Sequence, residues 1–142
     1  MNLTFPDFHA GGLVDVNFVR LVRRVDAEAV AAMVDCGKII WAWDISIRGR
    51  SRTRVWRFWL NEICTPQMTA RLTVDEVLDR ILPPSRTWYW AKEVGQLLLL
   101  ARNTIAALAR QLGATMKNRS FQFSRARLVA WLRERWVGGI NS

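Results

Sequence analysis

Apolar and polar residues alternate at helical spacing near the start of the chain. Apolar side chains fall three or four residues apart over Val14–Arg24, which predicts a helix with one buried face. Asp26 then stands where an N-cap is needed, and Gly37 has the place of a C-cap, so a second helix is predicted over Ala27–Cys36. The pattern therefore begins with two helices joined by a short turn.

A period of two replaces the helical period in the next segment. Ile39–Ile47 and Arg52–Leu60 both alternate, and the residues Arg48–Ser51 between them suit a type II′ hairpin turn. The register that this turn predicts pairs Trp43 with Trp56 and places the large side chains on one face. We therefore expect a tryptophan-rich hairpin with one apolar face.

A third helix is predicted from a capping box. Thr73–Glu76 has the Thr-x-x-Glu spacing of such a box, and Pro83 and Pro84 end the helix after Leu82. The segment 83–87 is the candidate linker between an N-terminal region, 1–82, and a C-terminal domain, 88–142. We find no internal sequence repeat. The pattern predicts an α+β protein, and the N-terminal region could itself be winged-helix-like.

The charge of the chain is concentrated in its C-terminal part. The net charge is +9, and 18 of the 21 basic residues are arginine. Residues 86–142 hold 10 basic and 2 acidic residues, whereas residues 1–85 hold 11 and 10. Such asymmetry indicates that the C-terminal part meets a polyanion. Arginine suits this role, because its guanidinium forks onto phosphates and guanine edges. The alternative is a basic protein whose charge serves solubility alone.

Residues 91–105 read A-K-E-V-G-Q-L-L-L-L-A-R-N-T-I. They resemble the helix-turn-helix pattern E-V-A-x-L-L-G-V-S-R-N-T-I, with Glu93-Val94, Leu97-Leu98, Leu100 and Arg102–Ile105 in matching positions. A basic tip and an alternating strand follow over 117–123, and Ser124 can cap a last helix with Leu128, Trp131 and Leu132 inside. The run 93–132 thus resembles the small winged helix-turn-helix domains of phage excisionases and MerR-type regulators.

Two positions depart from the pattern of those families. Leu99 stands where they have a turn glycine, and Ala101 stands where a serine caps the second helix. The turn could therefore be longer, or shifted by one residue. Gly95 keeps the small residue that the resemblance places where the two helices approach most closely.

The resemblance implies a recognition helix that begins near Arg102. Arginine can fork onto guanine and asparagine onto adenine, so Arg102 and Asn103 suit base recognition. The expected DNA-contacting residues are Arg102, Asn103, Thr104, Ala106, Arg110 and Gln111 on this helix, Lys117 and Arg119 on the wing, and Arg48, Arg50 and Arg52 on the earlier hairpin. The alternative for each of these sets is a solvated polar face.

These observations predict a protein that binds double-stranded DNA with a sequence preference. It would be a transcriptional regulator or an accessory factor of a mobile element, cytoplasmic and associated with the nucleoid. A homodimer is expected, because one small reading head contacts few base pairs. Two alternatives remain open: a protein-interaction module whose basic face docks an acidic partner, and an RNA or single-strand binder that stacks bases on tryptophan.

Other function classes are not expected. Asp44 and Glu62 are the carboxylates that could suggest a nuclease, but the predicted hairpin register keeps them apart. His9 is the sole histidine, so no zinc site, and no cofactor, is predicted. Cys36 and Cys64 are interpreted as reduced, buried thiols. The longest apolar run is too short to span a bilayer, so no membrane partner is expected.

Overall fold

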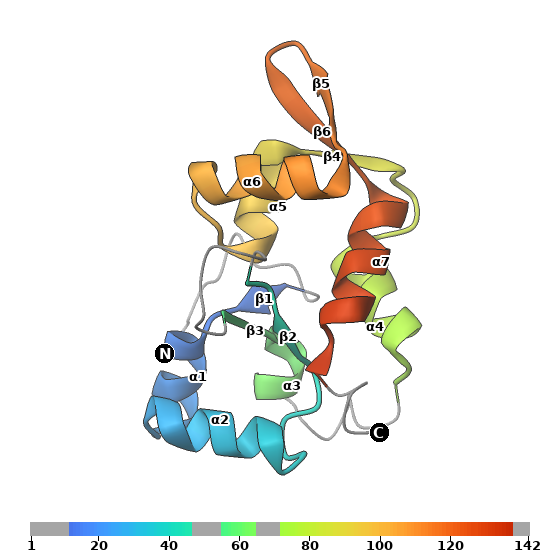
Figure 1. Cartoon of the computed structure of the whole chain (residues 1–142). Coiled ribbons are helices and arrows are strands. Elements are labelled where there is room, and N and C mark those ends of the chain that lie inside the picture. The colour runs from blue at the N-terminus through green and yellow to red at the C-terminus, as the bar shows by residue number, and fades with distance from the viewer. Residues whose placement is uncertain (1–11, 47–54, 65–71, 138–142) are drawn as a thin grey trace, which may run out of the picture.

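The computed structural model describes residues 12–46, 55–64 and 72–137, and it shows an α+β protein with two small antiparallel sheets (Figure 1). The predicted α+β class is thereby confirmed. The strands are β1 (Leu13–Val14), β2 (Ala42–Asp44), β3 (Trp56–Trp59), β4 (Trp88–Trp90), β5 (Thr115–Lys117) and β6 (Ser120–Ser124). The helices are α1 (Val16–Arg23), α2 (Ala27–Asp35), α3 (Leu60–Cys64), α4 (Val74–Ile81), α5 (Ala91–Leu98), α6 (Arg102–Leu112) and α7 (Arg125–Arg135).

The same order of elements occurs twice. The first unit runs β1-α1-α2-β2-β3-α3, and the second unit runs β4-α5-α6-β5-β6-α7, with α4 between them. In both sheets the last strand of the unit lies in the middle, giving the strand orders β1-β3-β2 and β4-β6-β5. The sequence contains no visible repeat, yet the structure repeats one topology.

The correspondence between the units extends to single residues. Helices α1 and α5 both have 8 residues and begin 75 positions apart, at Val16 and Ala91. Each ends on a left-handed residue, Arg24 with φ 57° and Leu99 with φ 55°. The next helix in each unit starts after an N-cap at the same spacing, namely Asp26 for α2 and Ala101 for α6. The two helix pairs therefore share one backbone geometry.

The helices at the start of the chain follow the sequence prediction with one change. The helix expected over Val14–Arg24 begins only at Val16, because Leu13 and Val14 pair with β3 instead. The N-cap role of Asp26 is confirmed, since its carboxylate accepts the backbone N–H of Ala29 at 2.8 Å. The capping box at Thr73–Glu76 is confirmed as well.

The predicted hairpin register is wrong by one residue. Trp43 lies opposite Arg57, and Trp56 lies opposite Asp44. The prediction assumed one apolar face, whereas both faces of the first sheet are buried. Phe58 packs among residues of α1 and α2 on one side, while Trp43 packs toward α4 and α7 on the other. The predicted turn, 48–51, lies outside the described residues.

One hydrophobic core contains residues of both units. It joins side chains of the first sheet, such as Trp43 and Trp59, to Leu98, Leu108 and Leu132 of the second unit. Beyond α7, the indole N–H of Trp136 donates to the carbonyl oxygen of Ile40 at 2.8 Å. The two units share this core. The linker predicted at 83–87, between two domains, therefore stays a prediction.

Glu62 is buried and has a structural role, whereas the two cysteines lie at the surface. Glu62 is 4% exposed, and its two carboxylate oxygens accept the backbone N–H groups of Ile40 and Trp41, each at 2.9 Å. Burial raises the pKa of Glu62, against the opposing effect of these two donors. Cys36 and Cys64 are exposed, so the prediction that they are buried was wrong.

Candidate nucleic-acid interface

The turn between α5 and α6 has the length that the helix-turn-helix pattern has. Leu99 occupies the left-handed position with φ 55° and ψ 46°, and α6 begins at Arg102. The backbone N–H of Leu100 closes the turn by donating to the carbonyl oxygen of Gly95 at 3.0 Å. The turn is therefore neither lengthened nor shifted, although it has a leucine in the left-handed position and an alanine at the N-cap.

Arg57 of β3, in the first unit, forms hydrogen bonds with the backbone of this turn. Its Nε donates to the carbonyl oxygen of Leu98 at 2.6 Å, and its Nη2 donates to that of Leu99 at 2.9 Å. These carbonyls end α5, where the helix dipole favours a cation. Burial lowers the pKa of Arg57, and the charge of Asp15 opposes this effect. Arg57 thus ties β3 of the first unit to the end of α5.

Gly95 lies at the closest approach of α5 to the turn and to α6. A Cβ atom built on it would stand 3.4 Å from the carbonyl oxygen of Leu100 and 3.5 Å from Cγ1 of Ile105. The position therefore has room for one methyl group at ordinary contact distance and for nothing larger.

Gly95→Ala is expected to raise the free energy of unfolding by about 0.5–1 kcal/mol, because alanine stabilises a helix interior relative to glycine. Gly95→Val should instead lower it by about 1–3 kcal/mol, since its extra methyl groups meet the backbone of the turn. Urea denaturation of the two variants measures both changes. If Gly95→Ala lowered the free energy of unfolding, the space beside Gly95 would be too small for a methyl group, contrary to the structure.

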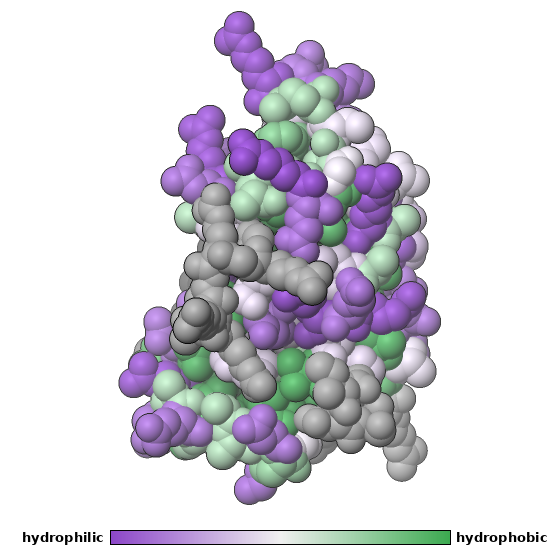
Figure 2. Space-filling model, viewed as in Figure 1, coloured by the Kyte–Doolittle hydropathy of each residue, from purple (hydrophilic) through white to green (hydrophobic). Residues whose placement is uncertain are grey.

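A groove of roughly 720 Å³ lies between α5, the start of α6 and the β5–β6 hairpin. Three cations line it, one from each element: Lys92, Arg102 and Arg119. Its remaining lining is uncharged and comprises Ala91, Gly95, Gln96, Leu100, Ile105, Ala106, Met116, Ser120 and Phe121. Figure 2 shows hydrophilic side chains projecting over this end of the molecule. The groove is therefore a concave surface of one sign of charge.

The first turn of α6 opens at this groove without a side-chain cap. Ala101 is the N-cap and has no side-chain oxygen, so no such bond closes the helix N-terminus. The N–H groups of a first helical turn have no partner within the helix. Beside Arg102, they are available to an anionic oxygen.

The rotation of α6 divides the predicted contact residues among three sides. Arg102 and Ala106 face the groove. At 100° per residue, Asn103 and Arg110 fall on the outermost stripe, opposite the buried Ile105 and Leu108. Gln111 and Thr104 lie on the side of α6 away from the groove. Gln111 and Arg110 border a separate hollow toward α7. The structure thus brings Arg102, Ala106 and Arg119 together and holds Gln111 apart from them.

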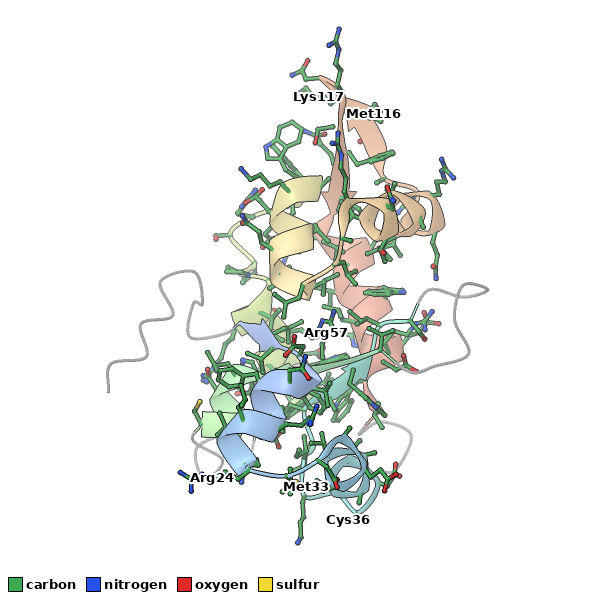
Figure 3. All side chains as sticks on the ribbon, turned by 90° about the vertical axis from the view of Figure 1, so that its left-hand side faces the viewer. Arg24, Met33, Cys36, Arg57, Met116 and Lys117 are labelled. Atoms are coloured by element: carbon green, nitrogen blue, oxygen red, sulfur yellow. The ribbon has the colours of Figure 1, made fainter. Side chains whose placement is uncertain are left out.

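The tip of the β5–β6 hairpin has a strained residue. Lys117 pairs with Ser120, and the two residues between them, Asn118 and Arg119, both have positive φ, at 52° and 66°. This is a type I′ turn, in which glycine is favoured where Arg119 stands. Figure 3 shows the hairpin with Met116 and Lys117 projecting from the body of the molecule. A bulky cation therefore occupies the glycine position at an exposed tip.

Arg119→Gly is expected to stabilise the fold and weaken binding of a polyanion. The free energy of unfolding should rise by about 0.5–1 kcal/mol, because glycine adopts positive φ without strain. If Arg119 contacts a DNA phosphate, the salt dependence of duplex affinity should fall by about one unit of slope. Arg119→Lys keeps the charge and the strain and is the matched control. Arg119→Gly binding DNA as the wild type does would remove the tip from the interface.

The cations of the second unit fall into two groups. Five have partners in the structure: Arg86 pairs with Glu93, Arg125 with Asp79, Arg133 with Asp75, Arg127 donates to Leu112 and Gly113, and Arg135 donates to Ser46. Within the described residues, the side chains of the other five have neither an ion pair nor a hydrogen bond: Lys92, Arg102, Arg110, Lys117 and Arg119. All five belong to α5, α6 and the β5–β6 hairpin, and three of them, Lys92, Arg102 and Arg119, line the groove.

Glu93, the acidic residue of α5, is bound by Arg86. The two guanidinium nitrogens of Arg86 bind both carboxylate oxygens, and Nη2 lies 2.7 Å from Oε1. This bonding lowers the pKa of Glu93, whose carboxylate also accepts the backbone N–H of Trp90 at 3.0 Å. The match of Glu93 to the motif thus reflects a structural role at the start of α5.

Sequence reasoning missed several residues of the groove. Lys92 and Gln96 are four residues apart on the exposed face of α5, and that spacing was the available signal. Ser120 and Phe121 of β6 gave no such signal, because the hairpin brings them to the groove. Arg48, Arg50 and Arg52 lie outside the described residues, so their placement stays a prediction.

The described residues contain no group of three or more histidine, cysteine and acidic side chains able to hold a metal ion. No helix among them is long and apolar enough to cross a bilayer. Comparison of the chain with protein families, with curated proteins and with solved structures finds no match.

Proposed function

We propose that the second unit is a winged helix-turn-helix domain that binds double-stranded DNA. In this proposal α6 is the recognition helix and the β5–β6 hairpin is the wing. The observation that carries it is that the cations of this unit with bonding partners and those without lie on different elements. Arginines on α7 are used by the fold, whereas all the cations on α5, α6 and the hairpin are unpaired. Three of these unpaired cations, Lys92, Arg102 and Arg119, line one groove, and such a basic groove attracts a polyanion.

The contacts divide by chemistry. Arg102 and Asn103 stand in the first turn of α6, where arginine can recognise guanine and asparagine adenine. Lys92 on α5 and Arg119 and Lys117 on the hairpin are placed on either side of this turn and suit phosphates. Arg110 extends the outer stripe of α6. Ala106 leaves space for a base edge, and Thr104 and Gln111 lie at the margin.

The biological role that we propose is transcriptional regulation or assistance to a mobile element. We propose a second contact with DNA in the first unit. Its β2–β3 connection has the same place in the order of elements as the β5–β6 hairpin has in the second unit. By sequence, this connection holds Arg48, Arg50 and Arg52. These three residues remain proposed contacts of a second wing.

Fluorescence anisotropy of the full chain with random-sequence DNA, over a salt series, tests the proposal. Duplex should be preferred to single strands, with affinity that falls steeply as salt rises. Arg102→Ala should weaken binding, while Arg80→Ala, which removes an exposed arginine from α4, should change it little. Equal loss in both variants would mean that net charge alone drives binding.

The other outcomes select the alternatives. A preference for single-stranded DNA or RNA, with quenching of tryptophan fluorescence, would favour the single-strand binder. Absence of duplex binding at low salt would reject the proposal and leave the basic face as a docking surface for an acidic protein.

A further inference from the structure

The first unit repeats the backbone of the second but not its chemistry. The residues 75 positions before Asn103 and Arg110 are Glu28 and Asp35, both exposed on α2. The residue before Arg102 by the same spacing is Ala27. Cations and an amide on α6 are thus replaced by acids and an alanine on α2. This helix repels a polyanion, so the first unit cannot repeat the proposed contact of α6 with DNA.

The face formed by α1 and α2 has exposed apolar residues instead. Leu21 corresponds by the same spacing to Gln96 of the groove, and its side chain is 79% exposed. Its neighbour Val22 is 42% exposed. Burying these side chains against another protein would remove their apolar surface from water.

The same face has charges of both signs on separate helices. Helix α1 ends with the exposed cations Arg20, Arg23 and Arg24 and has no acid after its N-cap Asp15. Helix α2 has Glu28 and Asp35 and no basic residue. A two-fold interface brings the same patch of both copies together, so each helix can meet its opposite in the other copy.

We propose that the α1–α2 face is the dimer interface, and that its occupant is a second copy of this chain. Helix α1 of each copy lies against α2 of the other, with Leu21 between them and arginines opposite Glu28 and Asp35. Figure 1 places α1 and α2 at the end of the molecule opposite the β5–β6 hairpin. Docking there leaves the groove of the second unit uncovered. The proposal does not depend on DNA binding.

Sedimentation velocity of the full chain without DNA, over a concentration series, tests the interface with paired charge reversals. Glu28→Arg with Asp35→Arg makes both helices basic, and Arg20→Glu with Arg24→Glu makes both acidic. Each double variant alone should be a monomer, because like charges then face each other. Their equimolar mixture should regain the dimer, since each helix again meets its opposite.

The outcomes are separable from those of the DNA experiment. Leu21→Ser, which changes no charge, should also weaken the dimer, and thermal unfolding checks that each variant folds. A monomeric wild type at the highest concentration would overturn the proposal. A dimer that persists in both double variants, or a mixture that stays monomeric, would overturn it too. Anisotropy with duplex DNA is read separately and can succeed in any of these cases.

Discussion

Replacing Arg57 by alanine is expected to lower the free energy of unfolding by about 2–4 kcal/mol. The guanidinium is half-buried and donates to the carbonyls of Leu98 and Leu99, which end α5, and to that of Trp56 at 2.7 Å. Hydrogen bonds from a charged group are the strong ones, and removing the donor leaves two helix-terminal carbonyls without it. The loss should exceed that of any exposed arginine, because it also detaches the first unit from the α5–α6 turn.

Urea denaturation with two companion variants measures this effect. Arg57→Lys keeps the charge but lacks the planar fork, so its loss should be intermediate. Arg80→Ala removes an exposed arginine and should change stability by less than about 0.5 kcal/mol. If Arg57→Ala resembles Arg80→Ala, the contact between the units contributes nothing to stability.

Local signals in the sequence were enough to predict the starts of α2, α4 and α7. Asp26, Thr73 and Ser124 each accept a backbone N–H in the helix that follows, as the spacing of polar and apolar residues indicates. These bonds join residues three apart, so they depend little on the rest of the fold. Caps of this kind can be recognised in a single sequence.

The first sheet was harder to predict because its register depends on contacts with helices that are distant in the sequence. An alternating pattern was interpreted as one buried and one exposed face, but helices cover both faces. The register then follows from packing on two sides, with Arg57 reaching a helix end 41 residues away. Strand β4 escaped prediction for the same reason, since it exists only by pairing with β6.

The repeat of the two units was not visible in the sequence. At a spacing of 75 residues, Val19 matches Val94 and Val30 matches Ile105, all of them buried. The exposed positions have changed in size and charge, as Glu28 and Asn103 show. Packing restricts only the inner face of each helix, and a few apolar matches do not distinguish a repeat from two ordinary helix pairs.

The candidate site was predicted where it depends on the motif and missed where it depends on folding. Arg102, Ala106 and Arg119 follow from the resemblance, and the structure places all three along one groove. Lys92 joins them because the hairpin folds back beside α5, a relation that no local pattern expresses. The sequence also does not show which arginines are paired, because Arg125 and Arg133 find their partners on α4 only in the folded chain.

Neutralising the three cations of the groove together is expected to remove most of the affinity for duplex DNA. In the variant Lys92→Ala/Arg102→Ala/Arg119→Ala, the slope of log affinity against log salt should fall by about two units, because Lys92 and Arg119 are the proposed phosphate contacts whereas Arg102 is proposed to contact a base. The affinity itself should fall by roughly a hundredfold or more, because each such contact contributes on the order of 1 kcal/mol or more. Salt-series anisotropy on one duplex measures both quantities.

The matched control removes three charges from elsewhere on the surface. In Lys38→Ala/Arg80→Ala/Arg133→Ala, the net charge changes by the same amount, and all three residues are exposed and outside the groove. Arg133→Ala also removes the exposed ion pair with Asp75, so thermal unfolding checks that this variant folds. Attraction by net charge alone would weaken both triple variants equally. If the groove binds the phosphate backbone, the control should keep nearly the full salt slope, whereas the groove variant should lose much of it. Equal slopes would therefore reject the groove as the DNA site even if the wild-type chain binds DNA.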